Sequence, residues 1–165
     1  MATTSPKRIN QVRAGIIGTG FIGPVHLEAL RRLGVQVVAI CDVADQAAAA
    51  AEKHGIPQSF SDYRALLRSP EVEVIHITAP NRFHCEMALA AIQAGKHVIC
   101  EKPLAMNTKE TAQILRAARA ARTVFAVNYN VRFYPAVLQL RRLVERGDLG
   151  DIIHVNGSYF QDWLF

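Results

Sequence analysis

The chain has 165 residues, half of them hydrophobic and a fifth charged, with a formal net charge of +5. This length and apolar content predict one domain with a sizeable core and exclude a wholly disordered chain. The basic residues are scattered through the expected helices without interleaved aromatic residues, so we expect no nucleic-acid partner.

We expect neither export nor a membrane span. Residues 1–11 are polar and predict a flexible arm, and no apolar run approaches the roughly 20 residues that span a bilayer. The three cysteines, Cys41, Cys85 and Cys100, are far apart and odd in number, which disfavours a disulfide framework and fits a reducing cytoplasm. No compact cluster of His, Cys and Asp has ligand spacing, so no metal is expected.

Short β-prone runs alternate with longer helical runs along most of the chain. Strands are expected at residues 12–18, 35–42, 57–60, 72–80, 97–101 and 123–129. Helices are expected at residues 22–34, 44–55, 61–69, 81–95, 107–121 and 134–148. This alternation predicts parallel βαβ units, and the nearly continuous apolar strands predict helices on both faces. The expected fold class is therefore α/β, a doubly wound parallel sheet of the Rossmann type.

The last segment, residues 150–165, breaks this pattern. It is β-prone, ends in large aromatic and apolar residues, and has no helix after it. We expect it to be the first strand of a truncated second α/β domain, because large apolar groups at a chain end would otherwise form an adhesive edge. An edge strand docked on this domain or on a second copy is the alternative. The predicted division is an arm at 1–11, a dinucleotide-binding domain at 12–129, and the start of a second domain at 130–165.

The turn after the first strand has the pattern GxGxxG, which binds dinucleotides when it joins a strand to a helix, as it does here. The first glycine permits the tight turn, the second lets the backbone approach a pyrophosphate, and the third lets the helix pack against the strand. The N–H groups at the helix start then face the phosphates. The cofactor contacts expected from this turn are Gly18, Thr19, Gly20, Phe21, Ile22 and Gly23.

Asp42 ends the second expected strand. An acid in this position can hydrogen-bond both ribose hydroxyls of the cofactor and repel a 2′-phosphate. No Arg occurs at residues 43–46 to receive such a phosphate, so NAD is expected in preference to NADP. The alternative is that Asp42 simply ends a strand.

Polar residues follow three of the expected strands: Asp42, then Pro80-Asn81, then Glu101-Lys102. In an open parallel sheet, ligands bind beyond the carboxyl ends of the strands, so these groups predict one binding edge. Lys102 could polarise or deprotonate a substrate hydroxyl while a nicotinamide accepts the hydride. Glu101 is expected to point away from the substrate, because successive strand residues face opposite sides. The alternative is that Lys102 is a solvated turn residue paired with Glu101.

The segments "GIIGTGFIGPVH", "ICD", "ITAPNRFH" and "VICEKPLA", in that order and spacing, resemble the Gfo/Idh/MocA oxidoreductases. The resemblance covers residues 12–160, and the EKP tripeptide is its most specific part. It implies a Rossmann domain followed by a second α/β domain through which the family forms homo-oligomers. It also implies NAD or NADP as cofactor, and a sugar, polyol or cyclitol as substrate.

By the same resemblance, Lys102 matches the lysine beside the nicotinamide and is the implied catalytic residue. The further cofactor contacts that the resemblance implies are Ala79, Pro80, Asn81, His84, Glu101, Lys102 and Arg132. The acid–base residues that the family carries in its second domain have no counterpart in this chain.

Two functions from different classes fit these observations. The first is an NAD(P)-dependent oxidoreductase, or its cofactor-binding portion, acting on a hydroxyl or keto carbon. The second is a non-catalytic dinucleotide-binding or redox-sensing module. A nucleotide-sugar or methyl-donor enzyme fits less well, because Asp42 and the EKP lysine suit a hydride-transfer enzyme better.

Overall fold

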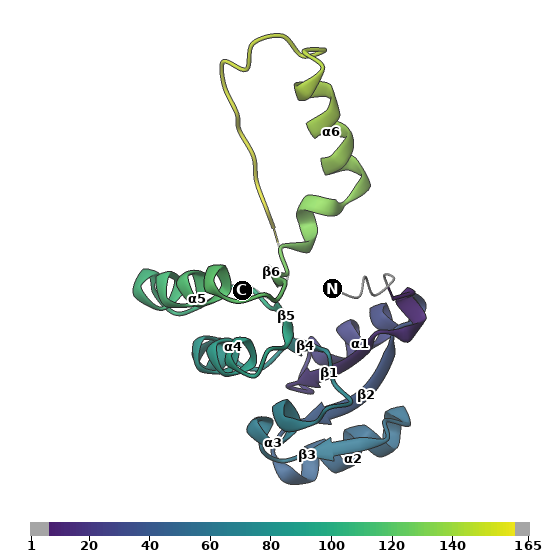
Figure 1. The fold of residues 1–165 in the computed structure, drawn as a ribbon. Helices are drawn as coiled ribbons and strands as arrows, with labels where there is room; N and C mark the ends of the chain where they lie inside the picture. The colour runs from purple at the N-terminus through teal and green to yellow at the C-terminus, as the bar shows by residue number, and fades with distance from the viewer. Residues whose placement is uncertain (1–6, 161–165) are drawn as a thin grey trace. The chain divides into compact units, whose positions relative to one another are not determined.

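The computed structural model describes residues 7–160, which divide into two compact units (Figure 1). The first unit ends at Asn128 and is an α/β domain, and the second begins at Tyr129. The first unit carries the dinucleotide-binding motif and the EKP segment. It is therefore the unit in which the predicted site can be tested.

The first unit is built on one six-stranded sheet in which every neighbouring pair is parallel. Its spatial order is β3-β2-β1-β4-β5-β6. The strands are β1 Arg13–Ile17, β2 Gln36–Cys41, β3 Gln58–Phe60, β4 Val74–Ile77, β5 His97–Cys100 and β6 Phe125–Val127. The predicted doubly wound parallel sheet is confirmed. Its order reverses between β1 and β4, which is the switch point at which such sheets bind ligands.

Helices connect the strands and cover both faces of the sheet (Figure 1). Those of the first unit are α1 Gly23–Arg32, α2 Ala44–His54, α3 Tyr63–Arg68, α4 His84–Gln93 and α5 Thr108–Ala120. Short 3₁₀ helices precede β1 and α4, at η1 Ile9–Gln11 and η2 Asn81–Phe83. Each α-helix of the first unit was expected from the sequence, with ends that differ by a few residues, whereas η1 was not expected.

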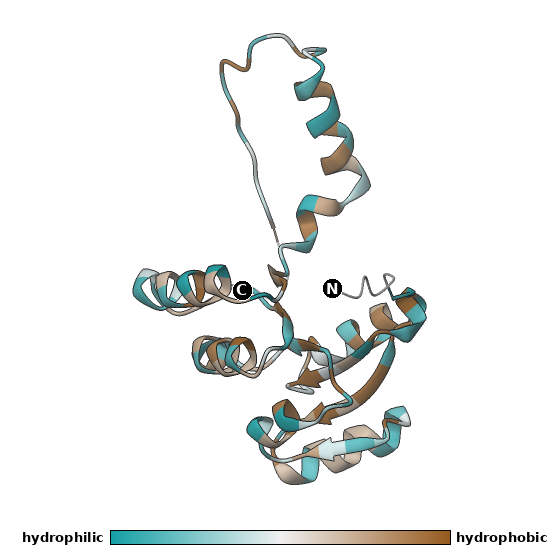
Figure 2. Cartoon of the chain, viewed as in Figure 1, coloured by the Kyte–Doolittle hydropathy of each residue, from teal (hydrophilic) through white to brown (hydrophobic). Residues whose placement is uncertain are grey.

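Two hydrophobic clusters lie on opposite faces of the sheet, because alternate residues of β1 point to opposite sides. Ala14 and Ile16 join the cluster beneath α1 and α2, whereas Ile17 joins the cluster beneath α3, α4 and α5. Strands β1 and β2 are mostly brown in Figure 2, as strands buried on both faces should be. The core thus fixes which side chains remain at the carboxyl edge.

Local signals in the sequence account for several helix ends. Asp62 caps α3 by accepting a hydrogen bond from the Arg64 backbone N–H, and Asn107 caps α5 by accepting one from Glu110. Gly55 ends α2 in the left-handed conformation, with φ of 59°. These caps satisfy backbone groups that the helices leave unpaired.

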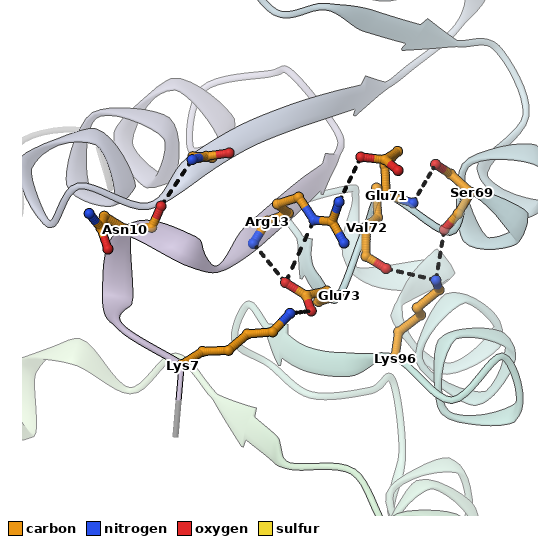
Figure 3. A network of polar contacts seen from close by, with 9 residues as sticks. Lys7, Asn10, Arg13, Ser69, Glu71, Val72, Glu73 and Lys96 are labelled. Carbon is orange, nitrogen blue, oxygen red and sulfur yellow. Dashed lines mark hydrogen bonds and ion pairs between the residues drawn. The ribbon is translucent and has the colours of Figure 1, made fainter. Parts of the chain in front are cut away.

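Ionic contacts join the segments at the amino-terminal edge of the sheet (Figure 3). Lys7 pairs with Glu73, and Arg13 Nη1 lies 2.7 Å from Glu71 Oε2. The Lys96 ammonium donates to the backbone oxygens of Ser69 and Val72, at 2.8 Å and 2.7 Å. Lys7 and η1, which the sequence placed in a flexible arm, are therefore part of the fold, and residues 1–6 lie outside the described part.

The second unit contains a 3₁₀ turn, η3 Asn130–Phe133, and one helix, α6 Pro135–Glu145, with Pro135 in its first turn as the sequence predicts. The strand expected in residues 150–165 is wrong for residues 151–160, which form no strand, and residues 161–165 lie outside the described part. A strand needs a hydrogen-bonded partner, and no segment within residues 7–160 pairs with this one. Within the same residues, every helix is too short or too polar to cross a bilayer.

Candidate functional site

The glycine-rich turn between β1 and α1 is packed closely on one side and open on the other. Gly18 has φ of 101°, and a Cβ added there would lie 2.6 Å from the backbone nitrogen of Ala79. A Cβ at Gly23 would lie 2.4 Å from the Gly18 carbonyl oxygen. At Gly20 nothing lies within 4 Å of an added Cβ. Gly18 and Gly23 therefore serve the fold, and Gly20 leaves the turn accessible to a ligand.

The acid at the end of β2 holds this turn in place. Asp42 Oδ2 accepts hydrogen bonds from the Thr19 backbone N–H and the Thr19 hydroxyl, both at 2.6 Å. Asp42 Oδ1 accepts from the Val43 backbone N–H at 2.8 Å. On the other side of β1, the Thr78 hydroxyl donates to the Gly18 carbonyl oxygen at 2.6 Å. The turn is thus fixed to both neighbouring strands.

A cavity of about 890 Å³ opens beside the turn, at the carboxyl ends of β1 to β4. This volume lies in the range of pockets that bind small molecules and cofactors. The predicted contacts that line it are Gly18, Gly20, Phe21, Ile22, Asp42, Ala79 and Pro80. The other lining residues are Ile17, Cys41, Val43, Gln46, Ser61, Asp62, Tyr63, Arg64, Thr78, Arg82, Phe83, Glu86 and Met87. The cavity therefore joins the glycine turn to Asp42, as a dinucleotide site requires.

Tyr63, Arg64 and Glu86 line one side of this cavity and bind each other. The Tyr63 hydroxyl donates to Glu86 Oε1 at 2.6 Å, and the Arg64 guanidinium pairs with the same oxygen. Burial, followed by the hydrogen bond to Glu86, raises the pKa of Tyr63 to about 12. The hydrogen bond from Tyr63, opposed by burial but helped by Arg64, lowers the pKa of Glu86. Around neutral pH, Glu86 thus carries a charge that Arg64 balances.

Glu101 and Lys102 follow β5, the neighbour of β4, at the same edge of the sheet. Glu101 is 6% exposed and turns into the domain, as its alternation along the strand predicts. Lys102 is exposed, and its ammonium has no hydrogen bond or ion pair with any of residues 7–160. The alternative prediction, a solvated turn residue paired with Glu101, is therefore wrong in its pairing, while the catalytic role of Lys102 stays a prediction.

Glu101 instead joins a buried polar cluster that we call the Glu101 cluster, formed by Glu101, His26, His76 and Asn128. Glu101 Oε1 accepts from Asn128 Nδ2 and lies 3.0 Å from His26 Nε2. His26 Nδ1 lies 2.9 Å from His76 Nδ1. Both histidines are buried, 7% and 6% exposed, as a structural role predicts. Four separate elements thus meet beside the EKP segment.

Two of these groups have displaced pKa values. Burial acts to raise the pKa of Glu101, but hydrogen bonds from Asn128, His26 and the Lys102 N–H outweigh it, so the pKa is lowered. Burial, and to a smaller extent the neighbouring His26, lower the pKa of His76 to about 4. Near neutral pH, Glu101 is therefore a carboxylate and His76 is uncharged.

His84 begins α4 and is fully buried between two turns. Its Nδ1 lies 2.7 Å from the Pro103 carbonyl oxygen, and its Nε2 lies 2.8 Å from the Ala79 carbonyl oxygen. With both ring nitrogens in use, any effect of His84 on a cofactor would pass through these two turns. Direct contact of His84 with a cofactor stays a prediction.

The predicted site residues do not all line the cavity. Arg132 belongs to η3 in the second unit, whose position relative to the first is not determined, so its role stays a prediction. The other predicted contacts outside the lining are Thr19, Gly23, Asn81, His84, Glu101 and Lys102. Of these, Thr19 and Gly23 stabilise the glycine turn, Thr19 by donating to Asp42 and Gly23 by packing closely on the Gly18 carbonyl oxygen.

Sequence reasoning missed the cavity wall formed by Ser61, Asp62, Tyr63 and Arg64. A usable signal existed, because these residues follow the short strand 57–60, and the rule that ligands bind beyond strand ends applies to that strand too. Within residues 7–160, no three His, Cys, Asp or Glu side chains are grouped as a metal site would require.

Comparison with known proteins identifies the family. A match to the family described as "Oxidoreductase family, NAD-binding Rossmann fold" covers residues 12–129, well over half of the chain. The chain belongs to the Gfo/Idh/MocA oxidoreductase family. The resemblance carried by the glycine turn and the EKP segment is thereby confirmed.

Relatives within the family include named dehydrogenases. Levoglucosan dehydrogenase of Pseudarthrobacter phenanthrenivorans is 35% identical over 94% of this chain and 42% of its own length. Inositol 2-dehydrogenase of Salmonella typhimurium is 36% identical over 90% of this chain and 46% of its own length. The chain thus spans less than half the length of these relatives.

Solved structures of the family share the fold. An NAD binding oxidoreductase from Klebsiella pneumoniae matches with a TM-score of 0.80 and 39% identity, over 85% of this chain and 40% of that one. Levoglucosan dehydrogenase in complex with NADH and levoglucosan matches with a TM-score of 0.80 and 35% identity, over 86% of this chain and 41% of that one. The fold is therefore one that holds a nicotinamide cofactor in a relative.

Proposed function

We propose that this chain is the cofactor-binding portion of an NAD-dependent dehydrogenase that oxidises a hydroxyl group of a sugar, polyol or cyclitol. The observation that carries the proposal is the cavity that joins the accessible Gly20 turn to Asp42 at the switch point of the sheet. A dinucleotide needs this combination, a backbone open to its pyrophosphate and an acid for its ribose. Family membership supports the proposal.

The residues present fit NAD. Gly20 has free space where a side chain would block the pyrophosphate, and α1 begins three residues later with the Gly23 N–H, since Pro24 has no N–H and the Val25 N–H donates to the Ile22 carbonyl oxygen. Asp42 lines the cavity and has no cationic partner among residues 7–160, so its carboxylate suits ribose hydroxyls and disfavours a 2′-phosphate. Phe21 is 95% exposed at the tip of the turn and can cover a bound ligand.

A bound nicotinamide cofactor supplies the hydride acceptor for alcohol oxidation. The chain's contribution is a proton-handling group on the same edge. Lys102 suits this role because its ammonium has no partner among the described residues and follows β5, next to β4. We assign it to hydrogen-bond the substrate hydroxyl and to receive or relay its proton.

The substrate class follows from the relatives, which are dehydrogenases of levoglucosan, inositol and, in Escherichia coli, D-glucosides. All three substrates are cyclic polyhydroxy compounds. We propose that residues 130–165 lead into the domain that holds such a substrate and through which homo-oligomers form. Val137, Leu140 and Val144 of α6 are exposed within the second unit, as expected for a helix that packs on further structure.

Isothermal titration of NAD and NADP into the chain tests the cofactor assignment. NAD should bind at least about tenfold more tightly than NADP, because Asp42 repels the extra phosphate. Asp42→Asn is the matched variant, since it retains an oxygen acceptor for Thr19 and loses only the charge. The variant should bind the two cofactors with nearly equal affinity. Tighter binding of NADP by the unmodified chain would contradict the assignment.

The alternative, a binding module without catalysis, predicts the same titrations. It differs in what happens when a protein containing this chain and a second domain of the family is given NAD and a cyclic polyol. The dehydrogenase proposal predicts NADH formation, and Lys102→Ala should reduce turnover strongly while NAD affinity is kept. Absence of turnover on levoglucosan, inositol and glucosides would favour the binding module.

A further inference from the structure

Two adjacent residues of the EKP segment carry opposite charges but do not pair. Glu101 is buried with both carboxylate oxygens engaged, and Lys102 is exposed with no partner for its ammonium among the described residues. Neighbouring charges on a turn commonly pair, and a carboxylate beside an amine favours its protonated form. Other interactions must therefore hold the Glu101 carboxylate away from the Lys102 ammonium.

The Glu101 cluster supplies the competing partners. Oε1 accepts from Asn128 Nδ2 and from His26 Nε2, the latter at 3.0 Å, while Oε2 accepts from the Lys102 backbone N–H at 3.2 Å. A carboxylate can only accept, so His26 Nε2 must donate. Three donors thus compensate the burial of this carboxylate, which fits its lowered pKa.

The donors are themselves fixed by the fold. His26 lies on α1, and its Nδ1 contacts His76 Nδ1 of β4 at 2.9 Å, with the two rings nearly perpendicular. Asn128 follows β6, and its backbone N–H donates to the Cys100 carbonyl oxygen at 2.8 Å. Neither donor can follow Glu101 outward without disturbing a strand or a helix.

We propose that His26 and Asn128 are positioning residues that hold Glu101 inside the domain and so keep the Lys102 amine unpaired for substrate. The proposal rests on the proposed function, because it takes Lys102 as the proton-handling group. The cluster acts on Lys102 in two ways. It withholds the nearest carboxylate from the ammonium, and through Oε2 it fixes the backbone from which Lys102 projects.

A matched pair of substitutions at His26 separates this role from a general loss of packing. In His26→Gln the amide nitrogen replaces Nε2 and retains the donor to Glu101, but the contact with His76 is lost. In His26→Asn the amide replaces Nδ1 and retains the contact with His76, but Glu101 loses a donor. Both variants put a neutral amide in the same buried position, so a purely structural effect should be similar in the two.

The readout is the rate at which an acylating reagent modifies Lys102 in the isolated chain at fixed pH, measured by peptide mass spectrometry. Lys109, whose side chain is exposed and has no hydrogen bond or ion pair within residues 7–160, serves as the internal reference lysine. His26→Asn should slow the modification of Lys102 by about fivefold, because the freed carboxylate pairs with the ammonium and keeps it protonated. His26→Gln should leave the rate within about twofold of the original.

A double variant completes the test. Glu101→Gln combined with His26→Asn should restore the rate at Lys102, because a neutral amide cannot hold an ammonium in its charged form. An unchanged rate in His26→Asn, an equal decrease in both His26 variants, or no recovery in the double variant would each overturn the proposal. No cofactor or substrate is present in this measurement, so its outcome is independent of whether NAD binds.

Discussion

The two edges of the parallel sheet use their charges differently. At the amino-terminal edge, Lys7 and Arg13 pair with Glu73, and Lys96 is hydrogen-bonded to backbone oxygens (Figure 3). At the carboxyl edge, Asp42 and Lys102 have no ionic partner among residues 7–160. Charges at the first edge join the ends of segments, whereas Asp42 and Lys102 at the second edge, unlike the paired Arg64 and Glu86, are left for a ligand.

Uncharged residues at the carboxyl edge also divide into those that support the fold and those left open to a ligand. Within the glycine turn, Gly18 touches Ala79 and supports the fold, while Gly20 faces open space. The Glu101 cluster lies between these two cases, because its buried groups are fully paired and yet adjoin a free lysine. Function at this edge therefore depends on which groups the fold leaves unpaired. Substitutions of residues that support the fold should change stability, whereas substitutions of residues left accessible to a ligand should change binding.

The largest effect is expected from the glycine turn. Gly18→Ala should lower the free energy of unfolding by about 4 kcal/mol, because φ of 101° disfavours a Cβ and the added carbon would clash with the Ala79 backbone. Gly20→Ala should change it by less than about 0.5 kcal/mol, yet weaken NAD binding at least about tenfold. Urea unfolding followed by circular dichroism, together with calorimetric titration, measures both quantities. Equal losses of stability in the two variants would remove the distinction between them.

The second effect concerns pH and the buried His76. Its pKa falls from 6.5 to about 4 on folding, so between these values the unfolded chain binds a proton that the folded chain does not. The free energy of unfolding should therefore decrease as pH falls through this window, by at most about 3 kcal/mol from His76, and be fully recovered above it. Glu101, with its lowered pKa, acts in the same direction at more acidic pH.

His76→Asn isolates this contribution. The amide does not titrate and keeps a polar group toward His26 Nδ1, so the unfolding free energy of the variant should depend less on pH between about pH 6.5 and about pH 4. Urea titrations at several pH values in this window compare the two slopes. If the slopes coincide, His76 is not the titrating group.

Much of the first unit could be predicted from the sequence, because its signals are local. Apolar runs located the strands, and the glycine pattern with Asp42 located the cavity, since each depends on neighbours a few residues apart. The Glu101 cluster could not be found in this way. Its hydrogen bonds join Glu101 to His26 and to Asn128 across 75 and 27 positions, and only the sheet order brings β4, β5 and β6 beneath α1.

The failures of prediction have a related cause. The strand expected within residues 150–165 followed from β-prone composition, but pairing with another strand is what makes a strand. The arm expected at residues 1–11 followed from polarity, yet Lys7 gains an ionic partner in Glu73 from a distant part of the chain. The composition of a segment indicates which structures it can adopt, and contacts with distant parts of the chain determine which of them it adopts.

The smallest effect is expected at the amino-terminal edge, where charge serves the fold alone. Lys96→Met removes two hydrogen bonds, to Ser69 O and Val72 O, but keeps most of the side chain's apolar stem. The free energy of unfolding should fall by about 1 kcal/mol. Lys109→Met, at an exposed site, should change it by less than about 0.5 kcal/mol and serves as the control.

The NAD affinity of Lys96→Met and Lys109→Met tests whether the two edges of the sheet are independent. Neither Lys96 nor Lys109 adjoins the cavity, so the dissociation constant for NAD should stay within about twofold of the original in both. A weaker NAD affinity in Lys96→Met, at a temperature where the variant is fully folded, would mean that the contacts at the amino-terminal edge affect NAD binding at the carboxyl edge through the strands. In that case the edges would not be independent, and the charges of Figure 3 would belong to the binding machinery.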